Sequence, residues 1–185
     1  MNYSAAQKLL ENFDQLEVMR NCYSLLSLVD VEKTLALDFL ETVKKCGDVT
    51  AAQWIEGNDN RWIFAKDNEF TLRALHAVRR SLVDEIGEVR ECEPSGLFWY
   101  PRGGYCGWHT NNNNEGDRAY LVWAAEEGKS FFRYQDPQTK EIVTKWEKRG
   151  WSLKRFTVSK ENSYWHCVGS RTDRFSIGFR FNPPS

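Results

Sequence analysis

The chain has 185 residues, a formal net charge of −1 and 14% aromatic residues. This length suits one domain with a hydrophobic core of its own. The near balance of basic and acidic residues gives no sign of a polyanionic partner such as nucleic acid. The aromatic content excludes a chain that is disordered throughout. The composition therefore predicts a single packed domain over residues 1–185.

Two further features predict the cellular environment. No apolar run approaches the length that crosses a bilayer, and Met1 to Ser4 lack the basic and apolar pattern of a secretory signal. The five cysteines are scattered and contain no CxxC pair, which argues against a zinc–thiolate site or a disulfide framework. We therefore expect a cytoplasmic protein without a membrane partner, whose cysteines are small buried side chains.

Residues 1–90 carry the pattern of amphipathic helices that support a core. Apolar residues recur at helical spacing over residues 5–19, from residue 30 to a stop at Gly47, and again after residue 68. Each of these segments follows a suitable N-cap: Ser4, Asp30 and Asn68. Between the second and third segments, Gln53 to Ala65 predicts a loop with a short strand.

Residues 91–182 have the pattern of a β-rich core. Short runs of aromatic and β-branched residues alternate with turn residues, and residues 136–139 (DPQT) predict a hairpin turn. Helices followed by many short strands favour an α+β fold with helices on one face of a β-sandwich or barrel. The predicted strands are Gly96 to Tyr100, Ala119 to Trp123, Ser130 to Tyr134, Glu141 to Thr144, Leu153 to Val158 and Phe175 to Phe181.

Two of the three histidines lie in this β-rich half, His109 in WHTNNNNEGDR and His166 in SYWHCV. Alternate residues of a strand point to one side, so we expect His109 and Asn111 to face the same point. His166 comes from a later strand. Two histidines and one oxygen ligand leave three positions open on an octahedral metal, which is the arrangement of non-haem iron oxygenases. The alternative is a structural β-sandwich in which both histidines are merely packed. His76 lies within the third predicted helix, and we expect it to be a surface or packing residue.

Arg174 opens the predicted strand RFSIGFRF, shortly after His166. An arginine in a buried strand needs an anionic partner, and its planar fork suits a carboxylate. That partner is either an Asp or Glu of the chain or the distal carboxylate of 2-oxoglutarate, and the metal-type histidine favours the second. Arg180 follows on the same side of a regular strand, as a second pocket cation or an exposed residue near the strand end.

The run from Tyr100 to Arg118, YPRGGYCGWHTNNNNEGDR, resembles the Fe(II)- and 2-oxoglutarate-dependent dioxygenases, and in particular their prolyl hydroxylase branch. In that branch a Gly-rich turn precedes His-x-Asp-Asn and a Gly-Asp/Arg turn that leads into a strand. The resemblance continues through KSFFRYQD, FTVSKENSYWHCV and RFSI in the same order, and covers roughly the C-terminal half of the chain.

The resemblance implies a distorted double-stranded β-helix, jelly-roll or cupin-like, with supporting N-terminal helices. It implies Fe(II) bound by His109, Asn111 and His166, and 2-oxoglutarate held by Arg174 with Tyr100 in the same pocket. The weaker candidates for the substrate pocket are Tyr105, Trp123, for which a core position is the favoured interpretation, and Arg180. The implied reaction is hydroxylation of a peptidyl or free amino acid, coupled to decarboxylation of 2-oxoglutarate to succinate.

Asn111 stands where the family has an aspartate ligand, and an amide oxygen is neutral and a weaker ligand than a carboxylate. Three alternatives follow. Asn111 binds the metal and activity is kept, or a two-histidine site has an extra open position as in halogenases of this superfamily, or the chain is a non-catalytic metal- or ligand-binding relative. The spacing of Arg174 and Arg180 is also that of AlkB-like nucleobase-demethylating oxygenases, although Ser176 replaces an Asn of that motif. We expect a small-molecule or peptide substrate.

Overall fold

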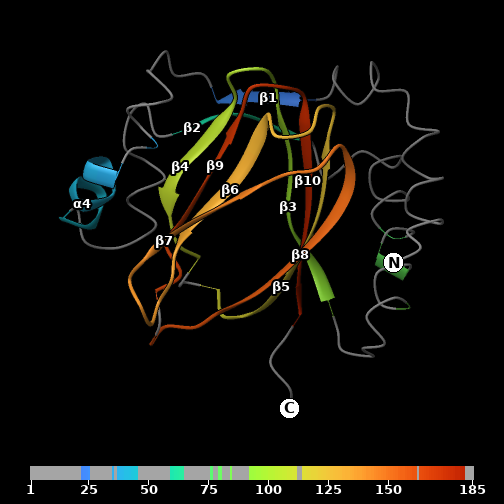
Figure 1. The fold of residues 1–185 in the computed structure, drawn as a ribbon. Coiled ribbons are helices and arrows are strands. Elements are labelled where there is room, and N and C mark those ends of the chain that lie inside the picture. The colour runs from blue at the N-terminus through green and yellow to red at the C-terminus, as the bar shows by residue number, and fades with distance from the viewer. Residues whose placement is uncertain are drawn as a thin grey trace.

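A computed structural model describes residues 22–25, 35, 37–45, 59–64, 76, 79–80, 84, 92–111, 114–161 and 163–181. Figure 1 shows a β-sandwich with one helix, α4 (Leu37–Lys45), beside it. The predicted helix at residues 5–19 lies outside the described part of the chain. The second predicted helix is confirmed over α4, and residues 76, 79, 80 and 84 of the third are helical. No described helix is long and apolar enough to span a membrane.

Eight strands form two antiparallel four-stranded sheets. The order of the first sheet is β3-β10-β5-β8, and that of the second is β4-β9-β6-β7. β2 pairs with β3 of the first sheet and β4 of the second, and β1 pairs with β2. The strand bounds are β1 Cys22–Leu25, β2 Asp59–Phe64, β3 Cys92–Tyr100, β4 Tyr105–His109, β5 Gly116–Ala124, β6 Ser130–Gln135, β7 Ile142–Trp146, β8 Gly150–Val158, β9 His166–Ser170 and β10 Arg174–Phe181.

Successive strands from β3 to β10 alternate between the sheets, except that β6 and β7 form a hairpin within the second sheet. The predicted turn at residues 136–139 connects this hairpin, where the Asp136 carboxylate accepts hydrogen bonds from the backbone N–H groups of Gln138 and Thr139. Alternation of this kind is the topology of a jelly-roll. The described core is therefore a cupin-like double-stranded β-helix, as predicted.

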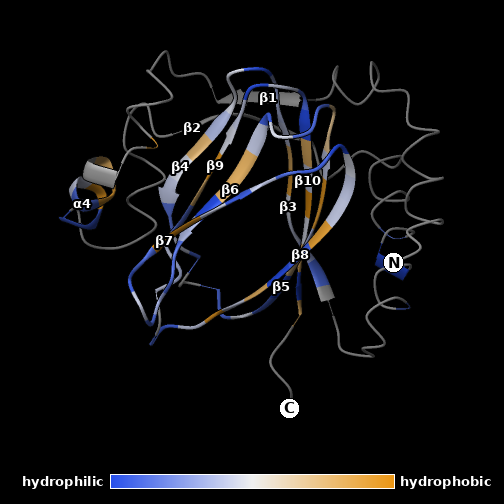
Figure 2. Ribbon diagram, viewed as in Figure 1, coloured by the Kyte–Doolittle hydropathy of each residue, from blue (hydrophilic) through white to orange (hydrophobic). Residues whose placement is uncertain are grey.

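Side-chain alternation on β4 separates two hydrophobic clusters. Tyr105 and Trp108 point outward, where they pack with Leu40 and Val43 of α4. Cys106 points inward, to a cluster between the two sheets that includes Tyr100, Phe132 and Val168. Figure 2 shows hydrophobic residues concentrated in the strands, while the loops around them are mainly hydrophilic. The inner cluster leaves the two ends of the sandwich for polar side chains.

All six predicted strands are present, and each extends further at one or both ends than predicted. β1 and β4 were not predicted, and β9 was predicted only through the position of His166 at its start. β4 follows Gly103 and Gly104 and contains Gly107, so its alternation of side chains is hard to recognise in the sequence. β1 and β2 show that the first 90 residues contribute strands as well as helices.

Candidate functional site

His109 and His166 lie side by side inside one end of the sandwich. β4 and β9 are antiparallel neighbours, and their register pairs His109 directly with His166. The two imidazole centroids are 4.2 Å apart with ring planes at 54°, and both side chains are buried. An irregularity in the pairing between Cys106 and His109 turns His109 to the interior after the outward Trp108. The register therefore brings together two histidines that are distant in the sequence.

Backbone carbonyl groups orient both rings. The Nδ1 atom of His109 lies 2.7 Å from the Gly107 oxygen, and that of His166 lies 2.8 Å from the Tyr164 oxygen. A carbonyl oxygen only accepts, so each Nδ1 carries the proton and donates it. The lone pair of each neutral imidazole is then on Nε2. This tautomer, held by a carbonyl group, is the form in which histidines bind metal ions.

Asn111 joins the histidines from the segment that follows β4. Its Nδ2 atom lies 3.4 Å from His166 Nε2. The oxygen and nitrogen of an amide are assigned by their partners, and the reversed amide would direct Oδ1 to the same point. The prediction that strand alternation aligns His109 and Asn111 is wrong, because β4 ends at His109. The three side chains are nevertheless brought together.

The donor set is two imidazole nitrogens and one amide oxygen. This set suits a divalent transition metal such as Fe(II), although an amide carries no charge. Within the described residues, no cluster of three His, Cys, Asp or Glu side chains has the arrangement of a metal site. The third donor beside the two histidines is the amide of Asn111. The residues fit a metal with reduced affinity.

Aromatic rings surround His166 on the inner side of the sandwich. Phe132 stacks on it with centroids 5.3 Å apart, and Phe156 and Tyr164 lie at 5.6 and 5.7 Å. Burial, together with Tyr134 and Asp136, raises the pKa of Tyr164 well above its usual value, so its phenol stays protonated. These rings exclude water from one side of the histidine pair. The aromatic residues of β6 and β8 were not singled out by their sequence.

Arg174 is the first residue of β10, at the opposite end of this strand from Arg180. Tyr100, its partner in the β3–β10 register, places its ring 4.9 Å below the guanidinium. Ser170 is four positions after His166 in β9, which is roughly 13 Å of extended chain. It pairs with Ser130, whose hydroxyl contacts the same Glu147 carboxylate as Arg174. Arg174 is 1% exposed. The structure therefore brings Tyr100 and Arg174 together, as predicted, but deep between the sheets.

The anionic partner of Arg174 is Glu147, in the turn between β7 and β8. Arg174 donates from Nε at 2.9 Å and from Nη2 at 3.0 Å to the two carboxylate oxygens. Arg174 Nη1 is buried and has no hydrogen-bond partner. Of the two partners that the sequence left open for Arg174, the acid of the chain is the one in place. Nothing in the sequence indicated this contact between a turn and a strand that are 27 positions apart along the chain.

Glu147 has two other partners besides Arg174. It accepts a hydrogen bond of 2.6 Å from Ser130, and the ammonium of Lys154 lies at 3.4 Å. Burial alone would raise the pKa of Glu147, but the charge of Arg174, with Lys154 and Ser130, outweighs it and lowers the pKa. Glu147 is thus a carboxylate between two cations, and the cluster keeps one positive charge in excess. That excess is available to a second carboxylate, such as the distal end of 2-oxoglutarate.

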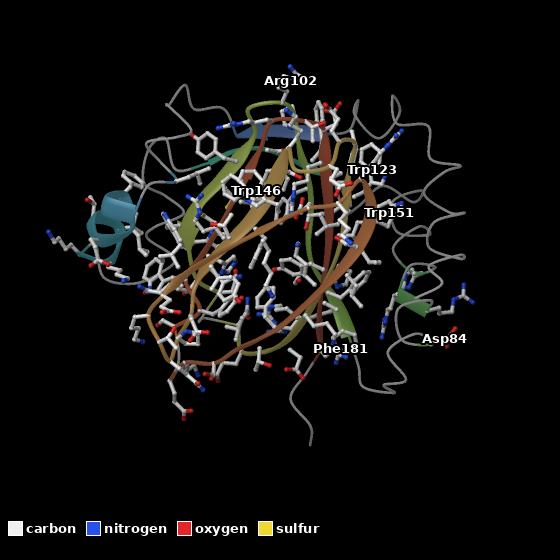
Figure 3. All side chains as sticks on the ribbon, in the orientation of Figure 1. Asp84, Arg102, Trp123, Trp146, Trp151 and Phe181 are labelled. Atoms are coloured by element: carbon white, nitrogen blue, oxygen red, sulfur yellow. The ribbon has the colours of Figure 1, made fainter. Side chains whose placement is uncertain are left out.

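Tyr105 and Trp123 do not lie at these sites. Tyr105 is fully buried on the outer face of β4 against α4, so its prediction as a substrate residue is wrong. Trp123 contacts Phe175 at 5.7 Å and pairs with Trp151 across β5 and β8 (Figure 3). It is a packing residue of the first sheet, which was the favoured interpretation. His76 is exposed, as expected.

Arg180 lies at the histidine end, beside a residue that sequence reasoning missed. Arg118 of β5 is its direct partner in the β5–β10 register. Both arginines line a cavity of about 280 Å³ that also reaches Asn111. The remaining lining residues are Glu93, Pro94, Ser95, Asn114 and Tyr120. Nothing local in the sequence marked Arg118, because its burial and its pairing with Arg180 depend on the β5–β10 register.

No family model and no curated protein matches the chain. Among solved structures, it is similar to a prolyl-4-hydroxylase from Pseudomonas putida, at 13% identity over 99% of this chain and 100% of that chain, with a TM-score of 0.46. It is also similar to an oxidoreductase of the 2OG-Fe(II) oxygenase family from Burkholderia pseudomallei, at 13% identity over 97% and 89%, with a TM-score of 0.48. A cupin superfamily protein from Desulfitobacterium hafniense matches 52% of this chain, and 71% of that chain, at 11% identity and a TM-score of 0.34. We therefore base the function on the residues of the site.

Proposed function

We propose that this chain is an Fe(II)- and 2-oxoglutarate-dependent oxygenase that hydroxylates a peptidyl or free amino acid. The observation that carries the proposal is the buried pair of His109 and His166, fixed by backbone carbonyl groups in the metal-binding tautomer beside Asn111. Bound iron would supply the activation of O₂ that hydroxylation of a C–H bond requires. The protein supplies the ligands and the surroundings.

Each residue of the site has a separate task in this proposal. His109, His166 and Asn111 would hold the metal, and three protein ligands would be compatible with binding of the keto acid and O₂. Phe132 and Phe156 keep water away from His166. The neutral phenol of Tyr164 adds no charge there.

The cluster of Arg174, Lys154 and Glu147 would receive the distal carboxylate of 2-oxoglutarate. Its surplus positive charge and the unpartnered Nη1 of Arg174 support this role. Glu147 already uses the other two donors of the guanidinium that face it. Binding of the co-substrate therefore requires Glu147 to share Arg174 or to leave it.

The proposal is tested by anaerobic titration with Fe(II), followed by measurement of succinate formed from 2-oxoglutarate in air. We expect stoichiometric metal binding and Fe(II)-dependent succinate, both lost in His109→Ala. His76→Ala is the matched control, because His76 is exposed on a helix and should change neither readout. Absence of metal binding to the intact protein would contradict the proposal.

A second candidate is a non-catalytic metal- or ligand-binding protein with the same fold. Two observations favour it: the neutral Asn111 in the donor set, and the carboxylate of Glu147 on Arg174. In this case the protein binds Fe(II) through both histidines but forms no succinate above the rate of free Fe(II). The same experiment therefore distinguishes the two candidates.

A further inference from the structure

Arg118 is a buried cation that lacks an acidic hydrogen-bond partner. It is 2% exposed, and its Nη2 donates to the backbone oxygen of Asn114, while Nη1 has no hydrogen-bond partner within the described part of the chain. Burial lowers the pKa of Arg118, although Tyr120, to which it is also hydrogen-bonded, and the charge of Asp117 act in the opposite direction. The nearby Arg180 is different, since it donates to Glu93 and to Asn114 Oδ1. Of these two arginines, Arg118 is therefore the one with a buried donor that a ligand could satisfy.

The cavity beside Arg118 has the size and charge for a small monoanion. Its volume of about 280 Å³ is just below the range of cavities that hold drug-sized ligands, about 300–1,000 Å³. Two arginines and one glutamate line it, so one positive charge is in excess. The buried hydroxyl of Ser95, also in the lining, has no hydrogen-bond partner either. Arg118 Nη1 and Ser95 Oγ are thus two buried polar atoms without a partner, and both belong to residues that line the cavity.

The position of the cavity connects it to the metal site. Asn111, which lies against His166, is also part of its lining. The backbone N–H of Asn114 donates to the backbone oxygen of Asn111 at 2.9 Å. Arg118 donates to the backbone oxygen of Asn114, and Arg180 donates to its side-chain oxygen. A molecule in this cavity therefore lies next to the metal ligands, whereas Arg174 and Glu147 are at the far end of the strands.

We propose that the cavity lined by Arg118, Arg180 and Ser95 binds the carboxylate of a small acid that reacts at the adjacent metal site. The inference deepens the proposed function, on which it rests for the reaction, and favours a free amino acid or similar acid over an uncharged stretch of peptide. Arg174 has both of its facing donors on Glu147, whereas no acidic side chain is hydrogen-bonded to Arg118 among the described residues. The carboxylate belongs either to the substrate or to the 2-oxo acid.

Nuclear magnetic resonance of arginine side chains tests the site directly. Metal-free protein with ¹⁵N-labelled arginine is titrated with acetate at constant ionic strength, and with acetamide as a neutral probe of the same size. We expect acetate to shift the Arg118 Nε–Hε signal to saturation in the millimolar range, which suits so small a ligand. Acetamide should leave it in place. A signal that does not respond to acetate, or responds equally to acetamide, would overturn the proposal.

Two variants sharpen this test. Ser95→Asp introduces a carboxylate into the cavity and should abolish the response of Arg118 to acetate. Arg102→Gln is the control, because Arg102 is exposed in the loop after β3, at the opposite end of the sandwich from Phe181 (Figure 3). It should leave the acetate response unchanged. An acetate response that persists in Ser95→Asp would contradict a site in this cavity.

The source of the carboxylate is read from Zn(II)-loaded protein with 2-oxoglutarate. If 2-oxoglutarate shifts Arg174 and acetate still shifts Arg118, the cavity holds the substrate acid. If 2-oxoglutarate shifts Arg118 and blocks acetate, the cavity holds the co-substrate, and both results uphold a carboxylate site. Failure of metal binding with an intact acetate response would refute the proposed function but not this cavity.

Discussion

At the scale of single residues, the amide of Asn111 and the carboxylate of Glu147 decide what this protein can do. Asn111 removes one negative charge from the ligands of the candidate metal, and Glu147 adds one to the guanidinium at the far end. A site with an aspartate as metal ligand, and with an arginine that has no acidic partner, would differ from this one in both of these charges. Each can be reversed by one substitution.

The change Asn111→Asp should strengthen metal binding. A carboxylate brings a unit charge and a better oxygen ligand to the same point beside His166, and we expect an affinity for Fe(II) about tenfold higher or more. Anaerobic calorimetric titration measures it. Asn114→Asp adds the same charge three residues away, and an equal gain in both variants would show that Asn111 is not a ligand.

The change Glu147→Gln should destabilise the protein at neutral pH. It leaves Arg174 and Lys154 without their anion, and loss of one partner of a buried pair costs about 3–5 kcal/mol. Urea unfolding measures this free energy. Glu127→Gln is the control, because Glu127 is exposed and should show no change.

The pH dependence of this difference follows from the lowered pKa of Glu147. Its contribution to stability is complete above the ordinary pKa near 4.5 and is lost as the pH falls through the lower value of the folded state. The gap between wild type and Glu147→Gln should therefore narrow as the pH falls below about 4.5. A gap that stays constant to lower pH would show that the charge of Glu147 is not what stabilises the fold.

At the scale of elements, β9 depends on the absence of a side chain at Gly169. A Cβ atom there would lie 2.6 Å from the Phe131 ring and 2.7 Å from Leu35, which covers the outer face of the second sheet. Gly169→Ala should lower the free energy of unfolding by about 1–3 kcal/mol through overpacking. The cost in a Leu35→Ala background should be smaller, and strict additivity in thermal unfolding would argue against this clash.

The strands also show how much of the fold and of the candidate site the sequence predicts. β5, β8 and β10 were found because aromatic and β-branched residues repeat along them, and the two histidines were found because both lie in the β-rich half. β4 was missed because its glycines interrupt the pattern. Glu147 and Arg118 were missed for another reason: their partners come from distant turns and strands, and contacts of that kind have no local signal.

At the scale of the whole molecule, the candidate metal site exists only in the folded state, because β4 and β9 are far apart in the sequence and become neighbours only when they pair in the second sheet. A metal that binds only the folded protein stabilises it by about 2.7 kcal/mol at a concentration of one hundred times Kd. We expect Zn(II) to raise Tm in calorimetry. His166→Ala should abolish the rise and His76→Ala should keep it. A rise that persists in His166→Ala would place the metal elsewhere.

The pairing of β2 determines which strand edges of the two sheets are open to another copy of this protein. By pairing with β3 and with β4, it occupies the edge that each sheet would otherwise present. On the opposite side the outer strands are β7 and β8, where Lys145 and Arg155 are exposed and Trp146 is 53% exposed. Unpaired strand edges are where chains add to one another and aggregate, and charged side chains oppose this. Aggregation through these sheets is therefore directed to the β7 and β8 side, where Lys145 and Arg155 oppose it and Trp146 favours it.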